Sequence, residues 1–146
     1  GFQGTAYPVL NWEKQDDVHG SGTNGGPILT YNSSTGVFTF AHTAYYLITF
    51  THYAYGNNID SRYIEHYLYV SWNQGANYDL HAYGTAHITN GQSGNNHAGQ
   101  TSSSIISGTP NTRLRFKVQC NNGSVYTGYD TNAQTTGFTI AKVAGI

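Results

Sequence analysis

The sequence predicts an all-β protein of about ten antiparallel strands, arranged as a sandwich, jelly roll or barrel. Short runs of β-branched and aromatic residues alternate with clusters of Gly, Asn and Ser along the chain. No sustained stretch repeats its apolar side chains at helical spacing. The chain has 13 tyrosines and only 9% charged residues, so it lacks the high net charge and low aromatic content typical of disorder.

The expected strands are bounded by turn residues, and the prolines agree with their limits. Pro8, Pro27 and Pro110 fall at expected strand ends or turns, where a missing N–H interrupts no hydrogen-bond ladder. In chain order, the expected strands are Ala6–Trp12, Pro27–Tyr31, Gly36–Phe40, Tyr45–Tyr55, Arg62–Trp72, Tyr78–Tyr83, Ser102–Ile106, Arg113–Cys120, Ser124–Tyr129 and Thr135–Val143. No shift in composition divides the 146 residues, so we expect a single domain over residues 1–146.

Two of these strands indicate how their faces are covered. Within Arg113–Cys120, apolar side chains alternate with basic and polar ones, which predicts one buried face and one exposed face. This alternation places Cys120, the only cysteine, in the buried set. Within Tyr45–Tyr53, the set that begins with Tyr45 and Leu47 is too apolar for an ordinary solvent face. We therefore expect this strand to be covered on both sides, by its own domain or by a partner subunit.

Composition argues against several kinds of partner and chemistry. The formal net charge of −1 gives no electrostatic footprint for nucleic acid, and no apolar run approaches the ~20 residues of a membrane span, so we expect neither nucleic-acid binding nor membrane insertion. The seven histidines include no His-x-His pair, and Gly-x-Ser-x-Gly is absent, so we expect no enzyme, no metal site and no cofactor. Calcium is the one exception considered, because Asp16 and Asp17 could bind it together with loop carbonyls; a charged turn is the alternative.

Aromatic side chains crowd the middle of the chain, next to segments rich in Asn, Gly and Ser. Rigid amphipathic rings beside small polar residues suit a recognition surface, and sugars fit it because rings stack on pyranose faces while Asn and Asp bind hydroxyls. The alternative is that the tyrosines simply fill sheet faces, where their strand propensity is high. The polar stretch Asn90–Gln100 predicts a long loop that would carry part of this surface. The candidate ligand-binding residues are Tyr55, Tyr63, Tyr67, Tyr83, Asn95, Asn96 and His97.

Several short motifs, taken in order, are similar to those of the tumour necrosis factor superfamily, especially the globular heads of the complement-one-q type. The motifs that carry this resemblance are Tyr31, Gly36-Val37-Phe38, Ala44-Tyr45-Tyr46, Leu68–Asn73 with Gln74 inserted before Gly75, Ser102–Ile106, Asn111–Leu114 and Thr136-Gly137-Phe138. The sequence departs from the family pattern at Ala44, where glycine is usual, and at Thr135, where an aromatic residue is usual. Asn111-Thr112 stands in place of Gly-Asp. The chain therefore resembles a remote member.

The resemblance implies a jelly-roll sandwich that assembles as a compact homotrimer. The residues it places at the trimer interface are Tyr45, Leu47, Thr49, Thr135, Gly137 and Thr139. The leading hypothesis is a non-catalytic trimeric head, extracellular or on a virion surface, that binds a surface glycan or protein multivalently. One alternative is a structural protein of a virus or phage, such as a capsid decoration, spike or fibre head. Another is a monomeric carbohydrate-binding or enzymatic sandwich.

Overall fold

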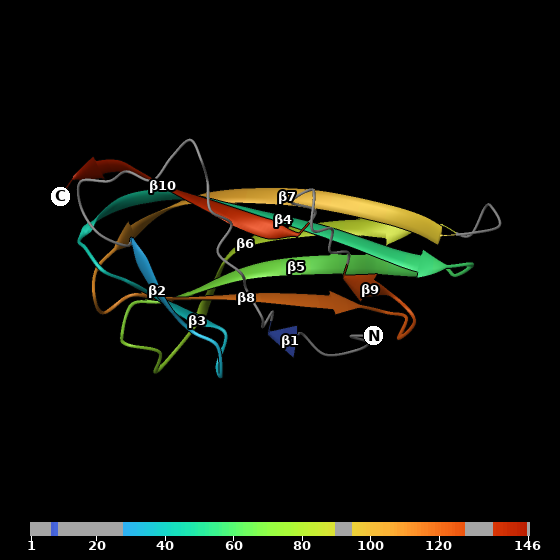
Figure 1. Cartoon of the computed structure of the whole chain (residues 1–146), viewed down its shortest axis with the longest axis horizontal. Helices are drawn as coiled ribbons and strands as arrows, with labels where there is room; N and C mark the ends of the chain where they lie inside the picture. Colours follow the sequence, from blue (N-terminus) through green and yellow to red (C-terminus); the bar gives the residue numbers. More distant parts are fainter. Residues whose placement is uncertain (1–6, 9–27, 90–94, 128–135, 146) are drawn as a thin grey trace.

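A computed structural model describes residues 7–8, 28–89, 95–127 and 136–145, and these residues contain ten β-strands and no helix (Figure 1). All strand pairs are antiparallel. The strands are β1 (Tyr7–Pro8), β2 (Leu29–Asn32), β3 (Val37–Phe40), β4 (Ala44–Asn57), β5 (Ser61–Ser71), β6 (Asp79–Ile88), β7 (Asn95–Gly108), β8 (Arg113–Cys120), β9 (Tyr126–Thr127) and β10 (Gly137–Gly145). The predicted all-β class is confirmed.

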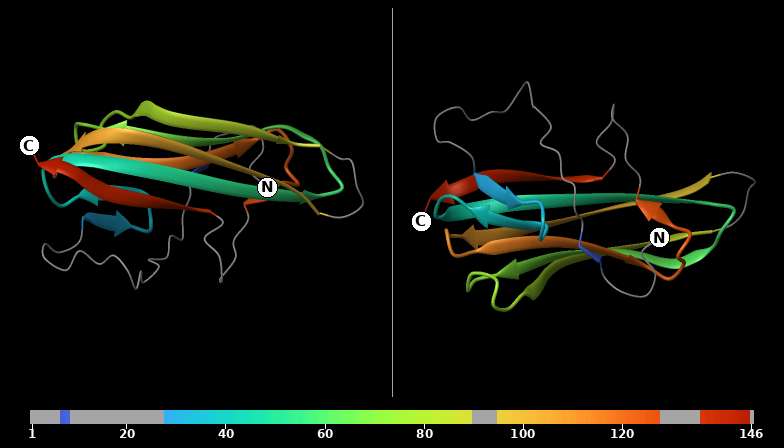
Figure 2. Two further views of the ribbon diagram at one scale, coloured as in Figure 1. Left: turned by 90° about the horizontal axis from the view of Figure 1, so that it is seen from above. Right: turned by 60° about the horizontal axis from the view of Figure 1, so that its bottom comes forward.

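The strands form two sheets that pack face to face as a sandwich. In the first sheet the order is β2-β3-β8-β5-β6, with β1 paired to β8. In the second sheet the order is β10-β4-β7, with β9 paired to β4. Seen from above, β10, β4 and β7 lie side by side in one layer over the strands of the first sheet (Figure 2, left). The long strand β4 is thus hydrogen-bonded on both sides along much of its length.

Phenylalanine rings from both sheets meet in the core. Phe116 of β8 is fully buried, and its ring centroid lies 4.8 Å from that of Phe50 on β4 and 4.5 Å from that of Phe138 on β10. Phe38 of β3 meets Phe116 edge-on at 5.8 Å. A smaller cluster of buried side chains at the other end of the sandwich includes Cys120, whose predicted burial is confirmed.

The expected loop over Asn90–Gln100 is wrong in its second half. Residues 95–100 belong to β7 and pair in register with residues 52–57 of β4. Asn, Gly and Gln have low intrinsic strand propensity, so this segment does not look like a strand by itself. It is ordered by the backbone groups of β4, which offer a continuous ladder over 14 residues. Pairing with β5 likewise explains why β6 runs to Ile88, beyond the expected Tyr83.

Two glycines on β7 provide a matched test of this packing. A Cβ built on Gly108 would lie 2.8 Å from the Phe40 ring and 2.9 Å from the Tyr46 ring, whereas one on Gly99 would meet only the Tyr53 ring, at 3.9 Å. We expect Gly108→Ala to lower the free energy of unfolding by about 1–3 kcal/mol, because the buried rings have no room to move. Gly99→Ala should stay within about 0.5 kcal/mol of the parent. Urea titration of both variants checks this, and equal midpoints would contradict it.

The outward side of the second sheet carries no Asp, Glu, Lys or Arg at the positions that alternate along β4, β7 and the first half of β10. We call this the uncharged face. Its outward residues are Tyr45, Leu47, Thr49, Thr51, Tyr53, Tyr55 and Asn57 of β4, His97, Gly99, Thr101, Ser103, Ile105 and Ser107 of β7, and Gly137, Thr139 and Ala141 of β10. Tyr45 is 43% exposed, Leu47 37% and Ile105 61%, so large apolar surface faces outward in the isolated chain. This agrees with the sequence-based view that the Tyr45 and Leu47 side is unusually apolar.

Candidate functional site

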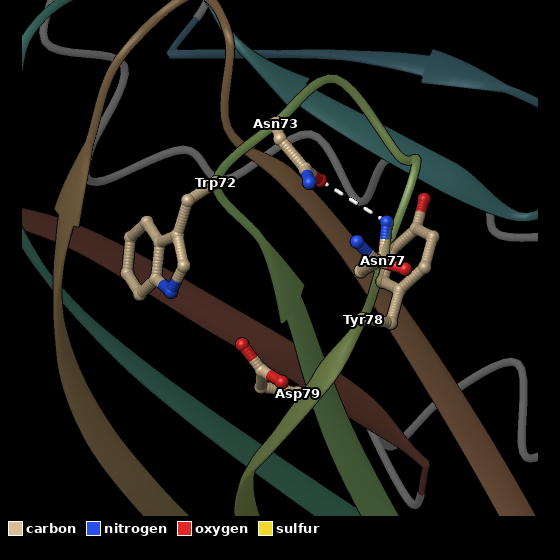
Figure 3. A pocket seen from close by; sticks show the side chains of 5 residues that line it. All are labelled: Trp72, Asn73, Asn77, Tyr78 and Asp79. Carbon is tan, nitrogen blue, oxygen red and sulfur yellow. Dashed lines mark hydrogen bonds between the residues drawn. The ribbon is translucent and has the colours of Figure 1, made fainter.

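An open cleft of about 510 Å³ lies at the hairpin that joins β5 to β6. We call it the hairpin cleft. Trp72 follows β5, Asn73 and Asn77 come from the turn, and Tyr78 and Asp79 lie where β6 begins. The indole of Trp72 and the carboxylate of Asp79 face the same space, whereas the Tyr78 ring points to the other side of the returning strand (Figure 3). The cleft volume falls within the range typical of small-ligand sites, roughly 300–1,000 Å³.

The turn that carries the cleft is held by a dense set of hydrogen bonds. The Ser71 hydroxyl donates to Asn73 Oδ1 over 2.8 Å and accepts from the Gly75 backbone N–H over 2.9 Å. Asn73 Oδ1 also accepts from the Asn77 backbone N–H over 3.1 Å, the bond drawn in Figure 3. Gly75 has φ +93°, a conformation that costs glycine little free energy because it has no side chain. These bonds fix the backbone between the cleft residues before any ligand arrives.

The neighbouring turn between β7 and β8 braces the hairpin from the side. Gln74, at φ 60°, donates from its backbone N–H to the Asn111 carbonyl over 3.0 Å and from Nε2 to Asn111 Oδ1 over 3.1 Å. A left-handed φ is uncommon for a residue with a side chain, and the two bonds to Asn111 offset that cost. Two turns that are distant in sequence therefore support each other at the same end of the sandwich.

Three polar groups of the cleft remain available for a ligand. Within the described residues, no hydrogen bond or ion pair engages the Asp79 carboxylate, the Asn77 carboxamide or the Trp72 indole N–H. Trp72 is 44% exposed, and its ring meets His81 edge-on at 5.9 Å between centroids. His81 Nδ1 is hydrogen-bonded to the Ser104 hydroxyl over 2.7 Å, so the indole has a fixed neighbour. Asp79 is the only lining side chain with a charge.

The residues on either side of the hairpin turn are a sequence signal for this cleft. Trp72 and Tyr78-Asp79 flank a short segment of Asn, Gln and Gly, which is the pattern of a hairpin turn with aromatic and carboxylate ends. What the pattern could not provide is the direction of the side chains. That direction depends on the left-handed conformations at Gln74 and Gly75, and the first of these is rare outside glycine.

The structure distributes the predicted ligand-binding residues over both sheets. Tyr63, Tyr67 and Tyr83 come from β5 and β6 of the first sheet, while Tyr55 and His97 lie on the uncharged face of the second. Asn96 lies on the inner side of β7, with its Nδ2 buried, and the side chain of Asn95 lies outside the described residues. The six candidates whose side chains are described therefore do not form one site.

The tyrosines of the first sheet lie beside a row of basic residues. Tyr67 stacks against Tyr83 with ring centroids 6.0 Å apart, and its hydroxyl donates to Glu65 Oε2 over 2.6 Å. Burial and this bond to Glu65 raise the pKa of Tyr67 above its ordinary value, so the hydroxyl stays protonated at physiological pH. The Lys117 ammonium lies 5.2 Å from the Tyr69 ring centroid, an arrangement typical of a cation–π contact. The ring and the hydroxyl of Tyr67 thus both contact residues of its own sheet.

A second aromatic group occupies the far end of the uncharged face. Tyr53 hydrogen-bonds through its hydroxyl to His97 Nδ1, and the two rings stack with centroids 5.4 Å apart. Tyr55 lies between His97 and the half-exposed Tyr126, at 6.2 and 5.7 Å. Two candidates from the sequence, Tyr55 and His97, are therefore adjacent to each other.

The predicted interface residues come together more closely than the ligand candidates. In the second sheet, Thr139 of β10 pairs with Thr49 of β4, and Gly137 pairs with Thr51. Tyr45 and Leu47 continue the same side of β4. A hollow of about 60 Å³ lies between β4 and β10, lined by Thr49, Thr51, Gly137, Phe138 and Thr139. Thr135 lies outside the described residues.

No cluster of three or more His, Cys, Asp or Glu side chains that could hold a metal occurs in the part of the chain that the structure describes. Asp16 and Asp17, the calcium candidates, lie outside it. No helix that could cross a membrane occurs among the described residues either.

The strand order and register define an all-β protein of the antiparallel sandwich class, with an open cleft at a hairpin and a large uncharged sheet face. Compared with known proteins, the chain matches no family model and no curated protein sequence.

Proposed function

We propose that the protein is a non-catalytic head that assembles as a homotrimer and binds a surface ligand, a glycan or a protein, multivalently. The observation that carries the proposal is the uncharged face, where exposed Tyr45, Leu47 and Ile105 sit among Thr and Ser without a single Asp, Glu, Lys or Arg. Exposed apolar surface of this kind marks an interaction site. An extracellular or virion-surface location is part of the same proposal.

A second copy of the chain suits this face better than an unrelated partner. Around a symmetry axis, residues near the axis meet copies of themselves, so a charged residue there would face its own charge. The face avoids that conflict completely. Four of its hydroxyls are also paired with each other, since Thr49 Oγ1 lies 2.8 Å from Ser103 Oγ and Thr51 Oγ1 lies 3.0 Å from Thr101 Oγ1. Covering them therefore leaves few polar groups without a partner.

The proposed advantage of this assembly is tighter binding through several sites. A shallow site with few contacts binds weakly, but several sites on one rigid body convert later binding events into intramolecular ones. The gain can reach about 10²–10⁴ over the single-site affinity without any new contact. The runner-up, a purely structural head of a virus or phage, shares the assembly and lacks the ligand, so ligand binding separates the two.

Substitution at Leu47 tests the assembly. Leu47→Glu would place a carboxylate on the uncharged face, where each copy would have to bury it without a counter-charge. We expect the mass in solution, measured by light scattering at micromolar concentration, to fall from that of a trimer to that of one 15.9 kDa chain. Leu80→Glu is the matched control, because Leu80 is 52% exposed on β6 of the first sheet, and it should keep the trimer mass. A parent protein that is already monomeric would refute the proposal.

A further inference from the structure

The hairpin cleft has the two features that recognition of a sugar ring requires, an exposed aromatic ring and free hydrogen-bonding groups beside it. Trp72 has the largest aromatic ring system among the side chains, is 44% exposed, and contacts the His81 ring at a steep angle. The face of an aromatic ring carries partial negative charge, so it attracts the C–H groups on the apolar side of a pyranose. The Asp79 carboxylate faces the same space as the indole (Figure 3).

We infer that the hairpin cleft binds one neutral hexopyranose ring, stacked on Trp72 and hydrogen-bonded through its hydroxyls to Asp79 and Asn77. This inference rests on the proposed recognition role and names the ligand class for it. Sugar hydroxyls both donate and accept. Asp79 supplies acceptors, the indole N–H supplies a donor, and the Asn77 carboxamide supplies both. Within the described residues none of these groups is already engaged.

The charge of the cleft selects a neutral sugar over an acidic one. Asp79 is the only charged side chain in the lining, so a sialic or uronic carboxylate next to it would be repelled. The nearby guanidinium of Arg115 is stacked on the Tyr78 ring, 4.4 Å from its centroid, and Tyr78 points away from the space between Trp72 and Asp79. Acidic sugars therefore have no free cation in the lining.

The rigid turn lowers the cost of binding. Ser71 and Asn73 fix the backbone through three hydrogen bonds, and Gln74 anchors it to the β7–β8 turn. A ligand then has to order few protein groups, and preorganisation of this kind improves affinity. A single shallow site of this size should nevertheless bind a monosaccharide weakly, with a dissociation constant of about 1 mM or above.

Tryptophan fluorescence provides the test, because the chain has two tryptophans. In a Trp12→Phe background, Trp72 is the only tryptophan, and titration with neutral methyl hexopyranosides should change its emission saturably. Methyl glucuronide and a methyl sialoside should bind at least about tenfold more weakly, because each adds a carboxylate beside Asp79. Asp79→Ala should lower the affinity for the neutral sugar by about tenfold or more, as expected for the loss of a hydrogen bond to a charged group.

Saturation-transfer NMR extends the test to Trp72 itself. Trp72→Ala should abolish transfer to the neutral sugar, and Trp72→Phe should retain part of it because a stacking ring remains. Tyr126→Ala, at a half-exposed tyrosine on β9 of the second sheet, should leave transfer unchanged. Binding of acidic sugars only, unchanged binding in Trp72→Ala, or no response to any neutral hexopyranoside would each overturn the inference. Light scattering on the same samples reports the trimer separately, so the failure of the cleft and the failure of the assembly are distinguishable.

Discussion

Lowering the pH from 8 to 5 is expected to cost the fold on the order of 4 kcal/mol, mainly through two buried histidines. His52 of β4 and His66 of β5 point into the space between the sheets and are 1% and 0% exposed. Burial, together with the nearby His66, lowers the pKa of His52 to about 3, and burial lowers the pKa of His66 to about 4. Both are therefore neutral in the folded protein throughout this range.

Stability falls and does not rise with decreasing pH because both histidines regain a pKa near 6.5 in the unfolded chain. Below that value the unfolded state binds about two more protons than the folded state, so stability falls as the pH falls. Protonation of these rings in the folded protein is unfavourable, because their neighbours are uncharged. The Phe50 ring lies 4.7 Å from the His66 ring, and the Ser102 hydroxyl lies 2.7 Å from His66 Nε2. Stability is fully present above about pH 7 and declines through pH 4.

Urea titrations at several pH values measure this effect as a slope. His52→Gln removes one of the two titrating groups, so the slope of unfolding free energy against pH between 6 and 5 should be roughly halved. This slope does not depend on how much stability the variant loses at pH 8. The carboxylates contribute little in this interval. An unchanged slope in His52→Gln, or NMR titration of either ring near pH 6.5, would contradict the prediction.

Phe116→Ala is expected to lower the free energy of unfolding by about 3–5 kcal/mol, the range for a buried aromatic ring replaced by a methyl group. Phe116 is fully buried, and its ring contacts the rings of Phe38, Phe50 and Phe138, which come from three different strands in both sheets. Its removal leaves a cavity where the two sheets are joined. The surrounding rings are stiff and cannot collapse into it.

Chemical denaturation at one fixed protein concentration tests this, because assembly would otherwise shift the midpoint. Tyr83→Ala is the control, since Tyr83 is 50% exposed on β6, and it should cost less than about 1 kcal/mol. A loss in Phe116→Ala no larger than that of the control would show that the aromatic cluster does not join the sheets.

Some parts of the fold could be predicted from the sequence because their pattern is local. The strand Arg113–Cys120 is found with its predicted bounds, since strict alternation of apolar and basic residues is typical of a strand with one buried face. The apolar side of Tyr45 and Leu47 was equally visible. In both cases the alternation of side-chain types along one strand indicates which residues are buried, without knowledge of the partner strands.

Other parts depend on a partner that is distant in sequence. The stretch from Asn95 to Gln100 becomes a strand because β4 pairs with it. Gly84 interrupts the pattern of β6, yet it is required there, since a Cβ at that position would lie 2.8 Å from His66 Nε2. The same limit applies to the cleft: Trp72 and Asp79 are seven positions apart, and only the turn at Gln74 and Gly75 brings them to one side.

In the proposed trimer, the position of the β5–β6 hairpin would distinguish one side of the assembly from the other. The hairpin lies at one end of the sandwich, beside the β7–β8 turn and near the start of β4. Rotation about a single axis preserves direction along that axis. If β4 runs along the axis of the proposed trimer, every copy would present this end, and its cleft, to the same side of the assembly. Three identical clefts would then bind one flat, repetitive surface at the same time.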